Sequence, residues 1–249
     1  KVDPTGNYLC EAGVERINFQ TRAGWTDPST LTSIPAVFTE FDNTVKPQSI
    51  WDPYRYINIW LADFSSSGLL GYATFPAFST LAGLDDTETD LDAGVVVESG
   101  TVGSITVPGT SAPYDYGRTL THELGHFFGL RHINGDGACL TDYCADTPPQ
   151  ADLTGGCPAV GTLNGCTPSV PMMFENYMDY TDDACLNTFT LNQSERCQAV
   201  MLNSPRRTQL RTSTTGTSPF PNRIYFKSGT NAVIETSTGT CPRFKDITI

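Results

Sequence analysis

The sequence is poor in basic residues, in histidine and in long apolar runs. Fifteen Lys and Arg stand against 27 Asp and Glu, which gives a formal net charge of -12. Such a surface repels phosphate backbones and anionic lipid head groups, so nucleic acid and membrane surfaces are poor partners. No apolar run approaches the roughly 18 residues of a membrane span. No secretory leader is recognisable at Lys1, so we expect any signal peptide to have been removed already.

The eight cysteines include no C-x-x-C pair, which argues against a zinc site built from thiolates. Their number is even, and five of them lie between residues 139 and 185. Disulfides, and with them an oxidising, extracellular compartment, are therefore the better interpretation, and we expect a secreted protein. The length of 249 residues, 39% of them hydrophobic, suits one enzyme-sized domain or two subdomains that share a cleft.

Strand patterns occur in the first half of the chain. Alternating or β-branched and aromatic residues predict strands at 14–19, 56–62, 69–75 and 94–97. An acidic stretch separates the last two, and we expect it to be a solvated surface. Its members are Asp85, Asp86, Glu88, Asp90 and Asp92.

Two helices are predicted further along the chain. The first begins at Tyr116, with Tyr114 or Asp115 near the cap, and ends at Gly129. The second opens on a capping box of Thr190 and Gln193 and runs to about residue 202. The segment between them, 133–188, is rich in Gly, Pro, Asp and Cys and needs disulfides or bound ions to hold it. The Ser/Thr-rich end has one strand candidate, at 223–227.

All three histidines of the chain fall within eleven residues, His-Glu-Leu-Gly-His-Phe-Phe-Gly-Leu-Arg-His. His122 and His126 share one face of a helix and can bind one zinc ion, while Glu123 stands beside the metal as a general base and acid. His132 reaches the same ion only if the helix stops, and Gly129 can make that turn because glycine tolerates a positive φ. Three protein ligands leave a fourth position for water, as in catalytic zinc sites.

The eleven-residue pattern resembles the metzincin signature, and Asn-Tyr-Met-Asp-Tyr at 176–180 resembles the Met-turn of that clan. Segments across residues 12–211 further resemble the pappalysin family, in its compact ulilysin-like and mirolysin-like branch. Among these segments are Gly-Tyr-Ala-Thr-Phe-Pro at 71–76 and Asp-Thr-Pro at 146–148. The resemblance implies that Met178 forms a floor beneath the metal and that the hydroxyl of Tyr180 stabilises the tetrahedral intermediate.

The implied fold is α+β, the metzincin zincin fold. Residues 1–132 would form an N-terminal subdomain with a twisted mixed β-sheet and the active-site helix. Residues 133–211 would form an irregular, disulfide-stapled C-terminal subdomain with a C-terminal helix, and 212–249 a tail. The family pattern implies the disulfides Cys139–Cys166 and Cys157–Cys185. It leaves the pairing of Cys10, Cys144, Cys197 and Cys241 open.

The resemblance also implies ions and specificity. Hard oxygen ligands after the third histidine suit a structural Ca²⁺: the candidates are Asp136, Asp142, Asp146 and Thr147, with Asp142, Thr147 and the carbonyl of Cys144 favoured. Aspartates that only cap turns are the alternative. Asp182 or Asp183 after the Met-turn would select Arg or Lys on the carboxyl side of the cut bond.

A secreted endopeptidase acting on protein and peptide substrates as a monomer is the leading hypothesis. Family members usually begin with a further strand and a long helix, and neither is recognisable before Cys10. The sequence thus leaves open a propeptide or a further fragment outside this chain. An inactive zinc-bound adhesion module is disfavoured because Glu123 is present. A zinc amidase is disfavoured because the strand at 69–75 offers an edge for an extended polypeptide.

Overall fold

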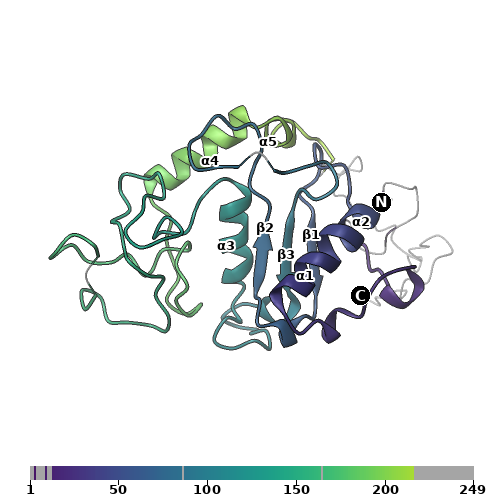
Figure 1. The fold of residues 1–249 in the computed structure, drawn as a ribbon, viewed down its shortest axis with the longest axis horizontal. Helices are drawn as coiled ribbons and strands as arrows, with labels where there is room; N and C mark the ends of the chain where they lie inside the picture. The colour runs from purple at the N-terminus through teal and green to yellow at the C-terminus, as the bar shows by residue number, and fades with distance from the viewer. Residues whose placement is uncertain (1–2, 4–8, 10–12, 86, 164, 216–249) are drawn as a thin grey trace, which may run out of the picture.

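The computed structural model describes residues 3, 9, 13–85, 87–163 and 165–215. The strand expected at 223–227 lies outside these residues, as do Cys10 and Cys241. In the described part, a small sheet stands behind helices α1 and α2, and helix α3 separates the sheet from a long irregular region (Figure 1). This arrangement is the α+β fold that was predicted. None of the described helices combines the length and the apolar character needed to cross a membrane.

The sheet has three strands in the order β1-β3-β2: β1 is Ile59–Ala62, β2 is Gly71–Ala73 and β3 is Val95–Glu98. Strand β3 is central, parallel to β1 and antiparallel to β2. Its three consecutive valines are fully buried, as expected for a strand covered on both faces. Three of the four predicted strands are thus confirmed: those at 56–62 and 69–75 are shorter than predicted, and that at 94–97 is shifted by one residue.

The predicted strand at 14–19 is wrong. Beyond a single bridge at Val14 the chain is irregular and then forms the short 3-10 helix Phe19–Thr21. The side chain of Asn18 accepts a hydrogen bond from the backbone of Gln20 and so caps this helix. An Asx turn of this kind competes with strand pairing, and alternation alone does not reveal it.

One face of the sheet is covered by helices that the sequence patterns did not predict. They are α1, Ile34–Glu40, and α2, Lys46–Ser49, joined through a π-helical turn at Phe41–Val45. Val37 and Phe41 pack with Val96 of β3 in one core cluster. Pro35 and Pro47 stand in the first turns of α1 and α2, and the π-helical turn between the helices changes the repeat, so each helix is too short for a regular apolar pattern to reveal it.

The opposite face of β3 packs on the helix that carries the histidine motif, α3, Arg118–Phe127. Val95 and Val97 form a core cluster with Phe127, whereas Val96 faces α1. Alternate residues of one strand thus hold the two helix layers apart. This packing fixes the position of α3 against the sheet.

Two further helices lie along one end of the molecule: α4, Leu191–Asn203, and α5, Pro205–Leu210 (Figure 1). The predicted capping box of Thr190 and Gln193 is present at the start of α4. Arg206 and Arg207 of α5 reach into the acidic stretch and form ion pairs with Glu88, whose side chain is fully buried. Glu88 is therefore not part of a solvated surface, which corrects the sequence expectation at this residue.

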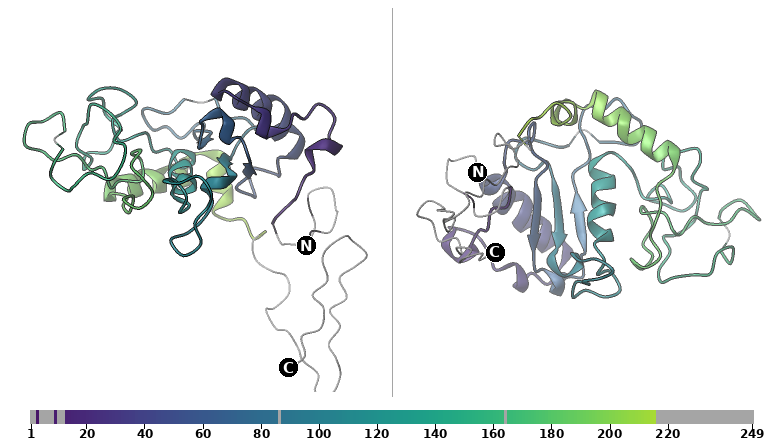
Figure 2. Two further views of the ribbon diagram at one scale, coloured as in Figure 1. Left: turned by 90° about the horizontal axis from the view of Figure 1, so that it is seen from below. Right: turned by 180° about the vertical axis from the view of Figure 1, so that it is seen from behind.

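Residues 133–188 contain no helix or strand among those that the structure describes, and Figure 2 shows them as loops on the far side of α3 from the sheet. Two disulfides, Cys139–Cys166 and Cys157–Cys185, hold this region. Both predicted pairs are therefore confirmed. Cross-links compensate here for the scarcity of regular backbone hydrogen bonding.

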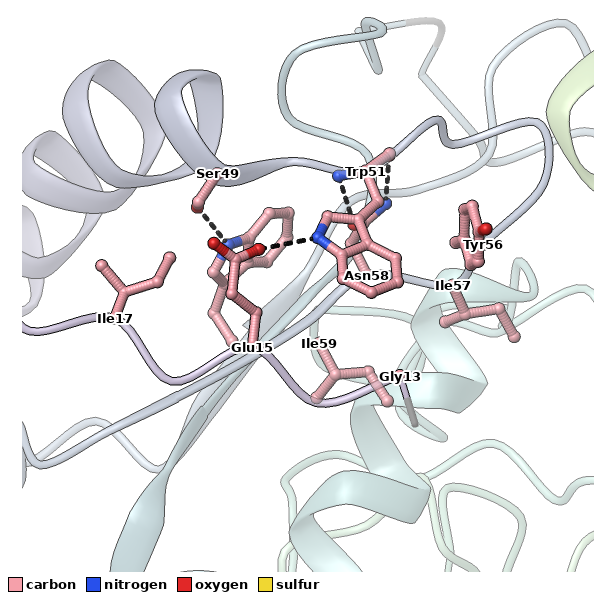
Figure 3. Close-up of a pocket in the computed structure, with 10 residues that line it drawn as sticks. Gly13, Glu15, Ile17, Ser49, Trp51, Tyr56, Ile57, Asn58 and Ile59 are labelled. Atoms are coloured by element: carbon pink, nitrogen blue, oxygen red, sulfur yellow. Dashed lines mark hydrogen bonds between the residues drawn. The ribbon is translucent and has the colours of Figure 1, made fainter. Parts of the chain in front are cut away.

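A cavity of about 290 Å³ lies beside β1, and no residue of the histidine motif lines it (Figure 3). The segment 13–17 forms one wall, and Trp51 and Trp60 form another. The indole of Trp51 donates to Glu15 and that of Trp60 donates to Ser49, both at 2.9 Å. The first bond ties the segment before α1 to the loop after α2, and the second ties the end of α2 to β1.

Candidate metal centre and active site

Three imidazoles converge at the C-terminal half of α3. The Nε2 atom of His126 lies 3.1 Å from Nε2 of His122 and 3.2 Å from Nε2 of His132. Candidate ligand atoms of the three side chains all fall within 4.8 Å of one another. His122 and His126 are buried, and His132 is partly exposed. Three nitrogens directed at one point match the donor set of a catalytic zinc site.

Each of these imidazoles has an acceptor on its other nitrogen. Nδ1 of His122 lies 2.6 Å from the carbonyl oxygen of Tyr177, and Nδ1 of His126 lies 2.7 Å from that of Leu130. Nδ1 of His132 is hydrogen-bonded to the carboxylate of Asp136. Donation from Nδ1–H leaves the lone pair on Nε2, which is the tautomer that a metal ion requires.

Burial keeps the two helical histidines neutral. It is the main cause that lowers the pKa of His122, to about 3, and His132 adds to the effect. The pKa of His126 lies well below its ordinary value for the same first reason. Neutral imidazole is the form that binds a metal ion, so the site is prepared for one at neutral pH.

The geometry of α3 explains how His132 joins the other two. The helix ends at Phe127, and Gly129 follows at φ 90°, so the expected turn is present. A Cβ on Gly129 would lie 2.7 Å from Val200, so space as well as backbone conformation requires glycine. The chain then reverses and returns His132 to the imidazoles of the helix.

The start of α3 differs from the prediction. The helix begins at Arg118 after Gly117, which has φ 82°, and not at Tyr116 after Tyr114 or Asp115. Oδ2 of Asp183 accepts from the backbone N–H of Tyr116 at 2.7 Å and of Arg118 at 3.1 Å. The cap thus comes from a residue distant in sequence, which local pattern rules cannot identify.

Glu123 follows His122 on α3 and is buried, with 6% of its surface exposed. Burial raises the pKa of its carboxyl to about 8. Its Oε2 atom is buried and has no hydrogen-bond partner. A Cβ on Gly71 of β2 would lie 2.9 Å from Cγ of Glu123, so glycine at this strand position leaves room for the carboxylate. An unpartnered buried carboxylate on the helix that carries two of the three candidate ligand nitrogens fits a role with a metal and its water.

Met178 and Tyr180 complete the surroundings of the imidazoles. Met178 is fully buried and packs with Leu130 and Ile133. A Cβ on Gly125 of α3 would lie 2.5 Å from Sδ of Met178. Glycine at this position therefore allows the turn that carries Met178 to pack closely against α3. The hydroxyl of Tyr180 lies 3.0 Å from Nε2 of His132, and burial raises its pKa to about 12.

Asp182 and Asp183 occupy different environments. Asp183 is 2% exposed and its Oδ2 is engaged by the start of α3, and burial raises the pKa of its carboxyl. Asp182 is partly exposed. Tyr114 lies close enough to both that their charges raise the pKa of its hydroxyl further, after the larger effect of burial.

The residues expected to bind calcium also come together. The hydroxyl of Thr147 lies 2.7 Å from Oδ1 of Asp142 and 2.8 Å from the carbonyl oxygen of Cys144. Oδ2 of Asp142 is buried without a hydrogen-bond partner, and burial raises the pKa of this carboxyl. Three oxygen-bearing groups and an orphan carboxylate oxygen are thus gathered in one loop.

Comparison with known proteins places this site in a family. The Peptidase_M43 model, described as pregnancy-associated plasma protein-A, matches residues 40–202, which include the histidine motif and the Met-turn. The chain belongs to the Peptidase_M43 family. It is a metzincin of the pappalysin branch, as the sequence resemblance predicted.

Relatives in sequence and in structure agree with this placement. An extracellular metalloprotease of Arthroderma otae is 41% identical over 145 residues, covering 57% of this chain and 50% of the relative. One of Verticillium alfalfae is 41% identical over 149 residues, covering 59% and 50%. Mature mirolysin of Tannerella forsythia, solved with a cleaved peptide, is 37% identical with a TM-score of 0.66 and covers 88% of this chain and 75% of that one. The chain spans about half the length of the two sequence relatives.

Several residues that shape the site had no signal in the sequence. Asp136 was considered as a calcium ligand, but it accepts from His132 and pairs with Arg131 at 2.6 Å. Arg196 donates to the carbonyl of Gly129 at 2.7 Å, and Arg207 donates to that of Phe127 at 3.0 Å. These arginines hold the carbonyls at the end of α3, and only the fold brings them there.

Proposed function

We propose that this chain is the catalytic part of a secreted zinc-dependent endopeptidase. The observation that carries the proposal is the convergence of three imidazoles: Nε2 of His122 and of His132 both lie within hydrogen-bond distance of Nε2 of His126, and each ring has its Nδ1 already engaged. Membership of a peptidase family and the extracellular metalloproteases among the relatives support it. The two disulfides support an oxidising compartment.

In this proposal His122, His126 and His132 hold the zinc and leave one position open. A zinc ion with three protein ligands polarises a carbonyl and lowers the pKa of a bound water to about 7. Glu123 takes the proton from the attacking water and then donates it to the leaving amine. Its buried, unpartnered Oε2 is available for both transfers. The hydroxyl of Tyr180, 3.0 Å from Nε2 of His132, can donate to the oxygen that gains charge on the scissile carbonyl.

Strand β2 is the proposed template for the substrate backbone. It is an edge strand of the described sheet, and Gly71 on it lies next to Glu123. An extended peptide can add to such an edge through main-chain hydrogen bonds, which brings its scissile carbonyl to the imidazoles. The mirolysin structure with a cleaved peptide supports polypeptide substrates over small amides.

We further propose that the enzyme acts as a monomer, with subdomains 1–132 and 133–211 and a tail at 212–249.

Selectivity for Arg or Lys after the scissile bond is proposed for the acidic pair behind the Met-turn. A carboxylate pairs with a guanidinium in a bidentate manner and disfavours apolar side chains. Asp182 is more accessible, while Asp183 uses only Oδ2 for the cap of α3. A peptide-library digest of Asp182→Ala and Asp183→Ala separates them: the responsible residue loses the basic preference. Bulky apolar residues after most bonds cut by the unmodified enzyme would refute the selectivity.

We also propose a structural Ca²⁺ bound by Asp142, Thr147 and the carbonyl of Cys144. The orphan Oδ2 of Asp142 supports this, because an unpaired buried carboxylate oxygen is costly without a cation. The calcium proposal rests on other residues than the zinc proposal, so either of the two proposals can be wrong without the other.

The activity test is casein degradation by the zinc-loaded protein, with and without a zinc chelator. Hydrolysis that stops on chelation and returns with zinc supports the endopeptidase. Zinc binding without hydrolysis of casein or of any peptide in a library would favour an inactive binding module instead. Cleavage of small amides alone would indicate an amidase. Each of the last two results contradicts the proposal.

A further inference from the structure

Two cysteines in the described part of the chain lie outside the two disulfides: Cys144 and Cys197. Cys144 is buried in the loop that follows the third histidine, and its backbone N–H donates to Asp142. Cys197 is on α4 and packs against the cluster of Leu130, Ile133 and Met178 beneath the imidazoles. Neither thiol takes part in the proposed catalysis.

Contacts on both sides of Cys144 hold its loop against the helix that carries Cys197. The N–H of Ala145 donates to the side chain of Asn192 at 3.2 Å, and the N–H of Asn192 donates to Asp146 at 2.9 Å. On the other side, the guanidinium of Arg196 lies 5.4 Å from the ring centre of Tyr143. The loop residues 143, 145 and 146 thus all touch α4, and Cys144 lies among them.

The electrostatics agree that the two thiols share one environment. Burial, then Asp142, raises the pKa of Cys144 to about 12, and Cys197 contributes in the same direction. The charge of Arg196, the residue before Cys197, acts on both thiols in the opposite sense. The effect of Cys197 on Cys144, and of one guanidinium on both thiols, is consistent with the two sulfurs lying near each other.

We propose that Cys144 and Cys197 form a third disulfide, which ties the loop of Asp142 and Thr147 to α4. The bond forms when the two thiols are oxidised by a small-molecule disulfide such as glutathione disulfide. Two S–H bonds are lost, one S–S bond forms, and the oxidant is reduced to two thiols. The conditions that close the two neighbouring disulfides supply this oxidant class. The bridge connects the Asp142 loop with the apolar cluster under the imidazoles.

Trypsin gives an unusually direct test. Residues 132–196 contain no Lys or Arg before Arg196, so one tryptic peptide carries five cysteines: Cys139, Cys144, Cys157, Cys166 and Cys185. Two internal disulfides use four of them and leave Cys144. Cys197 begins the next peptide, 197–206. The proposal predicts that 197–206 is found only attached to 132–196 until a reductant is added.

The experiment uses the full chain secreted from an oxidising host as the Glu123→Ala variant, which prevents self-digestion. The protein is denatured, alkylated without reductant, digested and analysed by mass spectrometry. A second protease that cuts between cysteines within 132–196 then identifies the linked residue as Cys144. In Cys144→Ser, the thiol of Cys197 should become available for alkylation. The double variant Cys144→Ser/Cys197→Ser should melt about 5–15 °C lower.

Two results would overturn the proposal. One is alkylation of both Cys144 and Cys197 in protein whose other two disulfides are intact. The other is attachment of peptide 197–206 to a peptide that contains Cys10 or Cys241. Both are read from the same digest, so they do not depend on whether the serine variants fold or on peptidase activity.

Discussion

The pairing of Arg207 with Glu88 is expected to make a large contribution to the stability of the protein around the end of α3. Both side chains are fully buried, and an Nη2 to Oε1 distance of 2.6 Å joins them. Arg207 also donates to the carbonyl of Phe127, and its guanidinium carbon lies 3.4 Å from the centre of the Phe127 ring. Replacement by Met removes all of these contacts while it keeps much of the buried volume.

The magnitude follows from the charge that Arg207→Met leaves behind. Removing one partner of a buried ion pair costs about 3–5 kcal/mol of unfolding free energy, because the other charge stays buried. Glu88 retains Arg206 at 3.2 Å, so we expect the lower end, about 3 kcal/mol. For a domain of this size that corresponds to a melting temperature lower by about 6–12 °C.

The assay is urea unfolding in the Glu123→Ala background, with Arg211→Met as the control for an exposed arginine. The control should change the unfolding free energy by less than about 0.5 kcal/mol. The double variant Glu88→Gln/Arg207→Met should recover part of the lost unfolding free energy, because it also removes the buried negative charge of Glu88. A loss below about 1 kcal/mol for Arg207→Met would refute the reasoning.

Three further predictions concern the cleft, its protons and the proposed calcium. Gly71→Ala should lower kcat at least about tenfold with zinc content unchanged, because its Cβ would meet Glu123; unchanged kcat would contradict this. Zinc-free protein should be most stable near pH 6.5 by urea unfolding. The raised pKa of Glu123, about 8, makes stability fall as the pH rises from about 4.5 to about 8. The lowered pKa values of His122, about 3, and of His126 make stability fall as the pH drops below about 6.5, and two histidines outweigh one carboxyl where the ranges overlap; a flat profile would disagree. Calcium should raise the melting temperature, and Asp142→Asn should abolish that rise; equal melting curves with and without calcium would exclude the site.

The parts of this site that are local in sequence could be predicted, and the parts that depend on the fold could not. Spacing alone placed His122, His126 and Glu123, and the tolerance of Gly129 for positive φ explained the return of His132. The capping box of α4 was predicted for the same reason, because its two members are three residues apart.

Long-range partners explain the failures. The start of α3 was misplaced because its cap, Asp183, comes from beyond the Met-turn. Glu88 was expected in solvent because its partner arginines lie more than a hundred residues away. Asp136 was weighed as a calcium ligand because nothing in its sequence spacing shows that His132 turns back to it.

The central claim is that Glu123 moves protons next to a metal that it does not bind. The most direct measurement is the zinc content and the kcat of Glu123→Gln beside those of the unmodified protein. We expect one zinc per chain in both, and a kcat lower by at least about a hundredfold in the variant, because general acid-base catalysis contributes that much or more. A zinc-loaded Glu123→Gln protein that cleaves casein at the unmodified rate would contradict the account.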